Sequence, residues 1–196
     1  MGRMIFLTTL FIISLQSRSQ SVGFSGSNYA NAGNAAALHV TNFTLEAWVK
    51  IEGTGATTSS GSGGVTLVPF IAKGRAESEL AAVDVNYIFG YDLTTRKLVA
   101  DFEDNATSAN HPVTGNTALG ACWTHVAATY NTATNTRKLY INGVLDQTLA
   151  LGAAFTPQSL SNVSTAIGTS LNSTNATEGF FNGSLDELRV WNVVRT

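Results

Sequence analysis

The stretch from Cys122 to Leu145 constrains the fold more than any other part of the chain. Its sequence, CWTHVAATYNTATNTRKLYINGVL, contains two alternating apolar and polar runs, a polar turn at 131–136 and a tight reversal at Asn142-Gly143. Asn-Gly is the strongest short-range signal for a β-hairpin, because both central residues of a type I′ turn need a positive φ. The segment therefore predicts a β-meander whose core positions are Val126, Ala128, Leu139 and Ile141.

The other long apolar segments show the same period of two. In residues 43–51, FTLEAWVKI, Phe43 and every second residue after it face one side, while Glu46 and Trp48 face the other. No stretch of ten or more residues has the period of a helix, so we expect an all-β fold, an antiparallel β-sandwich or jelly roll. Further strands are predicted within 21–33, 65–73 and 159–168, with a hairpin at 81–93 and 97–103 and a closing strand within 180–194. Polar loops are predicted at 53–64, 105–120 and 169–179, and a helix-compatible stretch at 75–83.

Composition narrows the class of partner. Charged residues make up 12% of the chain, against roughly 25% in an average domain. The formal net charge is -2, so the chain lacks the positive charge on which binders of nucleic acid and of anionic membranes rely. The single cysteine, Cys122, excludes an intrachain disulfide. We expect Cys122 to act as a small buried hydrophobic residue.

The N-terminal segment differs from the rest of the chain. Arg3 precedes the apolar run MIFLTTLFIISL, and small residues follow at Ser17 and Ser19. This pattern is typical of a secretory signal peptide, which we assign to residues 1–20. Residues 21–196 are expected to form one domain, secreted or at the cell surface and without membrane insertion. The chain stops just after its last predicted strand, as a piece of a larger multidomain protein would.

Three segments, in order, carry a family resemblance: FTLEAWVK, then WTHVAATYN followed by RKLYINGVL, and finally FNGSLDELRVWN. Together they resemble the laminin-G-like jelly-roll domains, which are related to pentraxins and concanavalin A-like lectins. The resemblance covers nearly the whole chain after the predicted signal. It implies a concanavalin A-like fold of two antiparallel sheets in an extracellular module that binds carbohydrate or protein, often with calcium at one rim.

Folds of this kind also include glycosidases, so a catalytic arrangement has to be considered. Retaining members place carboxylates at alternate positions of one strand, so that two of them flank the scissile bond. The nearest approach in this chain is Asp101-Phe102-Glu103-Asp104, which lacks that spacing. We therefore predict no catalytic residues and interpret this segment as a solvated strand end or a cation site.

Calcium is the cofactor that the resemblance implies. Hard cations bind carboxylate and carbonyl oxygens, which the chain offers near predicted strand ends. Asp186 follows Phe181-Asn182-Gly183, where the family pattern also has an aspartate, and it is interpreted either as a metal ligand or as a strand-end cap. The predicted metal ligands are Asp101, Glu103, Asp104 and Asp186.

A second candidate site lies on the outward positions of two strands. The family pattern places the strand of Glu46 and Trp48 beside the last strand, and alternation points their outer residues the same way. We expect a Glu46–Arg189 ion pair flanked by two indoles, which either closes the sheet or serves as a ligand platform. The predicted ligand-binding residues are Trp48, Asn105, Arg189 and Trp191.

Together these features predict an exported, non-enzymatic binding module that recognises a glycan or another extracellular protein. Two alternatives from other classes stay open. One is a glycoside hydrolase of the same fold, and the other is a passive structural or adhesion repeat of a larger surface protein.

Overall fold

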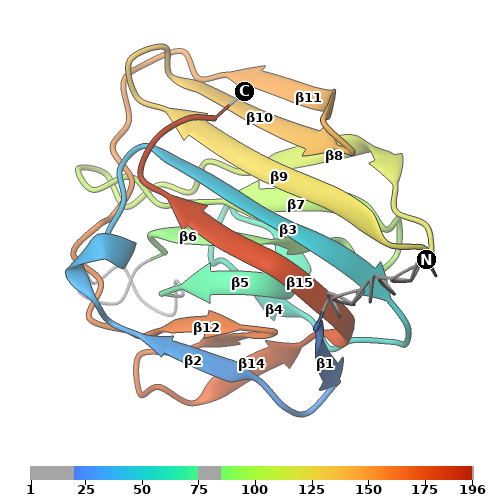
Figure 1. Ribbon diagram of the computed structural model, residues 1–196. Coiled ribbons are helices and arrows are strands. Elements are labelled where there is room, and N and C mark those ends of the chain that lie inside the picture. The colour runs from blue at the N-terminus through green and yellow to red at the C-terminus, as the bar shows by residue number, and fades with distance from the viewer. Residues whose placement is uncertain (1–19, 75–84, 196) are drawn as a thin grey trace, which may run out of the picture.

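The structure, a computed structural model, describes residues 20–74 and 85–195. Two large antiparallel β-sheets lie face to face (Figure 1). The helical content of these residues is a single 3-10 turn, η1 (Ala36–Leu38), and they contain no helix long and apolar enough to cross a membrane. The predicted all-β sandwich is confirmed. The predicted signal peptide, apart from Gln20, and the helix-compatible stretch at 75–83 lie outside the described residues.

The first sheet contains the first and last strands of the fold side by side with the central meander, and it faces the viewer in Figure 1. The last strand, β15 (Asn182–Trp191), pairs with β1 (Val22–Ser25) on one side and with β3 (Phe43–Ile51) on the other, and its pairing with β3 was implied by the resemblance. In spatial order its six strands are β1 (Val22–Ser25), β15 (Asn182–Trp191), β3 (Phe43–Ile51), β9 (Thr124–Asn131), β10 (Thr136–Ile141) and β11 (Val144–Ala150).

The second sheet lies behind the first. Its centre is the predicted hairpin, β6 (Tyr87–Tyr91) and β7 (Lys97–Asp101), in which Tyr91 pairs with Leu98. A separate small hairpin, β13 (Thr169–Leu171) with β14 (Thr177–Phe180), lies beside it. In spatial order the second sheet contains β2 (Ala30–Gly33), β12 (Thr165–Ile167), β5 (Thr66–Lys73), β6 (Tyr87–Tyr91), β7 (Lys97–Asp101) and β8 (Val113–Ala118), with β4 (Thr58–Ser59) paired to β5.

The strand β3 shows how the sequence pattern builds the core. Phe43 and the alternate residues through Ile51 are at most 3% exposed, and burying each large apolar side chain contributes roughly 1.5–3 kcal/mol. Phe43 contacts Tyr87 of the other sheet, with ring centroids 6.0 Å apart. The two sheets therefore share one core, and the outward face of β3 is left for other roles.

The central meander has the predicted form. Asn142 and Gly143 have φ values of 50° and 76°, as a type I′ turn requires. Val126, Ala128 and Leu139 are buried, and Ile141 packs against the core. The prediction for Cys122 is wrong, because this residue is exposed in the connection that precedes β9.

Strands also form within segments that were predicted to be loops. β8 lies inside 105–120, and β13 lies inside 169–179. Asp146 of β11 holds β8 in place, because its carboxylate accepts hydrogen bonds from the backbone N–H groups of Asn116 and Thr117 at 2.8 and 3.0 Å. A side chain at Gly115 would collide with the same carboxylate. A contact with a distant strand thus determines β8, and local sequence does not reveal it.

Candidate functional site on the outward face

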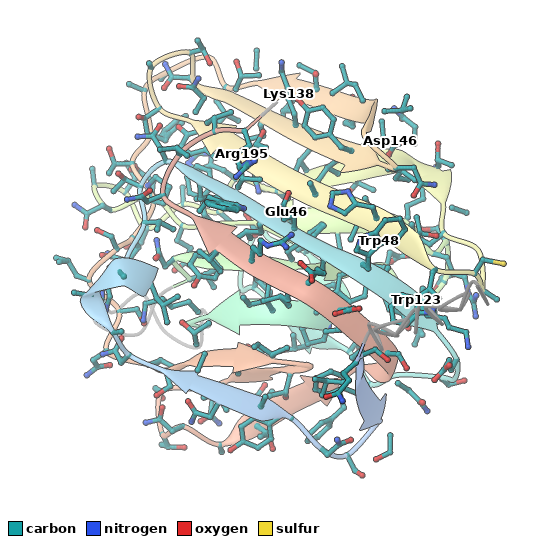
Figure 2. All side chains as sticks on the ribbon, viewed as in Figure 1. Glu46, Trp48, Trp123, Lys138, Asp146 and Arg195 are labelled. Atoms are coloured by element: carbon teal, nitrogen blue, oxygen red, sulfur yellow. The ribbon has the colours of Figure 1, made fainter. Side chains whose placement is uncertain are left out.

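The outward face of the first sheet gathers the polar and aromatic residues that the sequence singled out. In the antiparallel register Arg189 lies opposite Glu46, and Asp186 lies opposite Trp48. Trp48 also lies opposite His125 of β9. Directly opposed residues project from the same face. The side chains of three neighbouring strands therefore form one surface, with Glu46 and Trp48 near its middle (Figure 2).

Glu46 lies at the centre of this surface. Trp191 Nε1 donates a hydrogen bond to Glu46 Oε1 at 2.9 Å, and Arg189 Nη1 lies 3.7 Å from the same oxygen. His125 Nε2 is 3.8 Å from the other oxygen. Arg189 also pairs with Glu187. The predicted Glu46–Arg189 ion pair is confirmed, and it belongs to a cluster in which Glu46 orients the Trp191 indole and lies near the His125 imidazole.

A wide hollow of about 530 Å³ opens beside this network. Two indoles contribute to it, Trp48 with 41% and Trp123 with 40% of their surface exposed. Large aromatic surfaces exposed to solvent often mark binding sites. We call it the tryptophan hollow, and its lining residues are Ser21, Trp48, Trp123, Asp186 and Glu187.

A β-bulge explains why two consecutive acidic residues line the same hollow. Consecutive side chains of a regular strand point to opposite faces. In β15 the register shifts between Asp186 and Arg189, and Glu187 has a φ of 51°. Such a bulge redirects side chains locally. Both Asp186 and Glu187 therefore reach the tryptophan hollow, a feature that strict alternation in the sequence does not predict.

Two further hollows continue along the same face. The tyrosine hollow, of about 230 Å³, shares Thr129 and Tyr140 with the lysine hollow, of about 290 Å³. The tyrosine hollow also meets the tryptophan hollow where the rings of Trp48 and His125 touch, with centroids 5.5 Å apart. The tyrosine hollow is lined by Thr44, Glu46, His125, Ala127, Thr129, Tyr140, Gly143 and Arg195. The lysine hollow is lined by Thr129, Asn131, Thr134, Thr136, Lys138, Tyr140 and Val194.

The segment after β15 forms one wall of these hollows. Thr44 Oγ1 donates a hydrogen bond to the Val193 carbonyl and accepts one from the Arg195 N–H, both at 2.9 Å. The guanidinium carbon of Arg195 lies 4.1 Å from the centre of the Trp191 ring. The segment is thus anchored to β3, and the position of the Arg195 side chain is defined by stacking.

Asp101, a predicted metal ligand, is buried and already has hydrogen-bond partners. Ser60 Oγ donates to its Oδ2 at 2.6 Å, and the N–H groups of Phe102 and His111 donate to its Oδ1 at 2.8 and 2.9 Å. Arg137 Nη1 is 3.7 Å from Oδ1. Burial raises the pKa of Asp101 to about 6, even though Arg137 and these hydrogen bonds act in the opposite direction.

Glu103 is also fully buried, so the interpretation of 101–104 as a solvated strand end is wrong. Its Oε2 accepts a hydrogen bond from the Val85 N–H at 3.1 Å, and its Oε1 accepts one from Asn110 Nδ2 at 3.3 Å. The physical reason is that neighbouring loops cover the end of β7. Alternation shows which way a side chain points, but it does not show what lies over it.

Asp104 stabilises the loop that follows β7. Burial alone would raise the pKa of Asp104, but hydrogen bonds from Thr156, Thr107 and Ala106 outweigh it and lower the pKa below its ordinary value. The neighbouring Asn105 has an exposed side chain, and its N–H donates to the Thr156 carbonyl at 2.7 Å. Asn105 lines none of the three hollows on the outward face.

The four predicted calcium ligands do not form one site. Asp101, Glu103 and Asp104 lie at the end of β7 in the second sheet, whereas Asp186 lies in β15 of the first. The first three already accept hydrogen bonds from protein N–H or O–H groups, which compete with a cation for the same oxygens. Across residues 20–74 and 85–195, no group of three His, Cys, Asp or Glu side chains could hold a metal ion. These residues do not fit a calcium site as they are placed, and calcium binding stays a prediction.

Sequence reasoning missed several residues of this face. His125 is one of them, and its partly exposed ring lies against Trp48. Its place opposite Trp48 follows from the register of β3 with β9, which depends on the tertiary fold. Trp123 precedes its strand, and Arg195 follows the last one, so neither belongs to an alternating pattern.

Comparisons with known proteins agree with this architecture. A laminin-G family model, described as "Concanavalin A-like lectin/glucanases superfamily", matches residues 24–196. None of the curated proteins matches the chain in sequence.

Solved structures show the same fold at low sequence identity. The CBM40 module of the Ruminococcus gnavus IT-sialidase, bound to α2,3-sialyllactose, has 15% identity and a TM-score of 0.70, with 90% of this chain and 91% of that one covered. A SAP-like pentraxin from Limulus polyphemus has 17% identity and a TM-score of 0.61, covering 93% and 80%. A putative carbohydrate binding protein from Bacteroides ovatus has 20% identity and a TM-score of 0.53, covering 90% and 41%.

Proposed function

The chain belongs to the laminin-G family of the concanavalin A-like lectin/glucanases superfamily, and from this premise we propose that it is a carbohydrate-binding module without catalytic activity. The glycan contacts the outward face of the first sheet and enters the tryptophan hollow. An extracellular protein that carries such a glycan is an equivalent partner for this surface.

One observation carries the proposal: two exposed indoles and two carboxylates line the same hollow. Sugars offer both C–H faces, which pack on aromatic rings, and hydroxyl groups, which donate hydrogen bonds. Trp48 and Trp123 supply the rings, and Asp186 and Glu187 supply acceptors. Concave sites that combine aromatic surface with a few polar groups are typical of small-ligand binding.

The comparisons support the ligand class. The Ruminococcus gnavus module was solved with a sialylated sugar, and the Bacteroides ovatus protein is described as a putative carbohydrate binding protein. Both share the fold of this chain at 20% identity or less, so they support carbohydrate binding in general and leave the sugar to be found by experiment.

A position outside the cell accords with this function. The predicted secretory signal at residues 1–20 would export the chain. Charged residues make up only 12% of the sequence, which leaves a surface rich in hydroxyl and amide groups. We therefore propose that the module acts in the secreted or cell-surface space, where glycans are displayed.

A glycoside hydrolase is the alternative of a different class. Such enzymes place two carboxyl groups on either side of the scissile bond. Asp186 and Glu187 are adjacent residues of one bulge and lie on one wall of the hollow. This arrangement favours hydrogen bonding to hydroxyls over acid–base cleavage. Release of reducing ends from any glycan that binds would favour the hydrolase instead.

A glycan array tests the proposal with three variants. Trp48→Ala and Trp123→Ala remove the two indoles, and Tyr29→Ala removes an aromatic ring of equal exposure, 41%, that lies outside the tryptophan hollow. We expect each tryptophan variant to weaken binding by about tenfold or more, as at other aromatic hot spots. Tyr29→Ala should bind like the wild type.

Equal binding by the wild type and both tryptophan variants would move the site away from this hollow. Absence of binding to any glycan on the array would favour a passive structural or adhesion repeat.

A further inference from the structure

The three hollows of the outward face differ in charge along their length. Asp186 and Glu187 line the tryptophan hollow at one end. Arg195 lines the tyrosine hollow, and Lys138 lines the lysine hollow at the other end. Figure 2 shows this separation, with Trp123 and Trp48 toward one side of the sheet and with Arg195 and Lys138 toward the other. A ligand that spans the face therefore contacts hydrogen-bond acceptors at one end and cations at the other.

Arg195 and Lys138 supply positive charge at this end of the face. Among the residues that the structure describes, neither Arg195 nor Lys138 forms an ion pair with a carboxylate. Glu46 also lines the tyrosine hollow, but Trp191 and Arg189 already engage it. Among the described residues that line these two hollows, two cations therefore face one carboxylate, which leaves an excess of positive charge at this end.

Arg195 is arranged to receive an anion. Its backbone is held by Thr44, and its guanidinium stacks on the Trp191 ring. Stacking occupies one flat face of the guanidinium and leaves the N–H groups, which lie in its plane, free to donate. A guanidinium held in this way loses little further freedom when it binds a carboxylate or a sulfate.

The floor beside these cations suits a sugar ring. Tyr140 and Thr129 line both the tyrosine and the lysine hollows. Tyr140 offers an aromatic surface with a hydroxyl at its end, and Thr129 adds a small polar side chain. An acidic sugar on this floor would have its charged group near Arg195 and Lys138.

From this geometry we infer that the module selects acidic glycans, with an anionic sugar at the Arg195 and Lys138 end and a neutral sugar in the tryptophan hollow. The inference rests on the proposed function, because it assigns a charge and a direction to the glycan at the same face. The anionic group is a carboxylate, as in a uronic or sialic acid, or a sulfate, and both bind a guanidinium through two oxygens.

Binding to neutral, carboxylated and sulfated oligosaccharides of matched length tests the inference. The informative variants are Arg195→Gln and Lys138→Gln. Matched controls are Arg96→Gln, an exposed arginine in the turn between β6 and β7, and Lys97→Gln, a half-exposed lysine of β7. Neither control residue lines the three hollows.

We expect the wild type to bind acidic oligosaccharides about tenfold or more tightly than neutral ones, since hydrogen bonds to charged groups are the strong ones. Arg195→Gln should remove most of that preference and Lys138→Gln a smaller part, while both controls keep it. The preference should also shrink as salt concentration rises, because the two cations are open to solvent.

Other outcomes separate this inference from the proposed function. Tight binding to neutral oligosaccharides that Arg195→Gln leaves unchanged would overturn the charge preference and keep the carbohydrate module. Binding to none of the oligosaccharides would overturn both. A preference that all four cation variants retain would place the anion elsewhere on the molecule and overturn the inference. Preference for the sulfated or the carboxylated set would identify the anionic group.

Discussion

Two arginine–carboxylate pairs in this molecule have the same separation and different consequences. Arg137 Nη1 lies 3.7 Å from Asp101 between the sheets, and Arg189 Nη1 lies 3.7 Å from Glu46 on the outward face. The first pair is 1% and 0% exposed, and the second is 46% and 15% exposed. Burial, and not the distance, decides that the first pair is part of the scaffold and that the second is available to a ligand.

The surroundings of the two pairs reinforce this difference. Asp101 receives three hydrogen bonds from the protein, and Arg137 lies 5.0 Å from the centre of the Phe102 ring. Glu46 orients Trp191 through a hydrogen bond, and Glu46 itself lines the tyrosine hollow. A charged cluster in the sequence is therefore a weak guide to function until the residues that cover it are known.

The largest expected effect comes from breaking the buried pair. Asp101→Ala would leave Arg137 and the donors from Ser60, Phe102 and His111 without their acceptor. We expect a loss of about 3–5 kcal/mol in the free energy of unfolding, measured by denaturant titration. Asp101→Asn keeps an acceptor oxygen, so its free energy of unfolding should fall by clearly less. Equal losses for the two variants would contradict this role for the acceptor.

The buried pair should also have a pH signature. The pKa of Asp101 is raised from 3.8 to about 6, so the folded chain keeps a proton that the unfolded chain loses. The free energy of unfolding should then fall as pH rises from about 4 to about 6, by at most about 3 kcal/mol from this group, and change little above that range. Thermal melts across this range would show a flatter profile for Asp101→Asn. The same slope in that variant would assign the effect to other groups.

Breaking the exposed pair should have a smaller effect. Arg189→Ala removes the partner of Glu46. Because solvent screens both groups, we expect the free energy of unfolding to fall by about 1 kcal/mol or less. The same denaturant titration measures it, with Asp101→Ala as the reference. A loss as large as that of Asp101→Ala would show that the exposed pair closes the sheet and would remove the contrast between the two clusters.

Calcium should have the smallest effect. Asp101, Glu103 and Asp104 already accept hydrogen bonds from the protein, so we expect millimolar calcium to leave the melting temperature unchanged. A bound ion would stabilise the folded state by mass action. A clear rise in melting temperature, reversed by a chelator, would instead support the calcium site predicted from the sequence.

Much of the fold could be predicted because the alternation of apolar and polar residues along a strand indicates which side chains are buried. The inward residues of β3, the turn at Asn142-Gly143 and the pairing that brings Arg189 to Glu46 all followed from sequence patterns and the family resemblance. The strand β8 could not be predicted, since it depends on hydrogen bonds to Asp146 from a distant strand.

The candidate site was only partly predictable for a similar reason. Trp48, Arg189 and Trp191 lie on the outward face as expected. Glu103, interpreted as part of a solvated strand end or a cation site, is buried. Glu187 joins the tryptophan hollow through a bulge that breaks alternation. Tertiary packing decides which residues loops cover and where a bulge shifts the register. A single sequence does not show either.

The most direct test of a glycan site on the outward face is isothermal titration calorimetry with the strongest ligand from the glycan array, using the wild type, Trp48→Ala and Asp101→Asn at one pH. We expect Trp48→Ala to weaken binding by about tenfold or more at nearly unchanged melting temperature, and Asp101→Asn to alter stability and leave affinity unchanged. Full affinity in Trp48→Ala together with lost affinity in folded Asp101→Asn would contradict a site on this face.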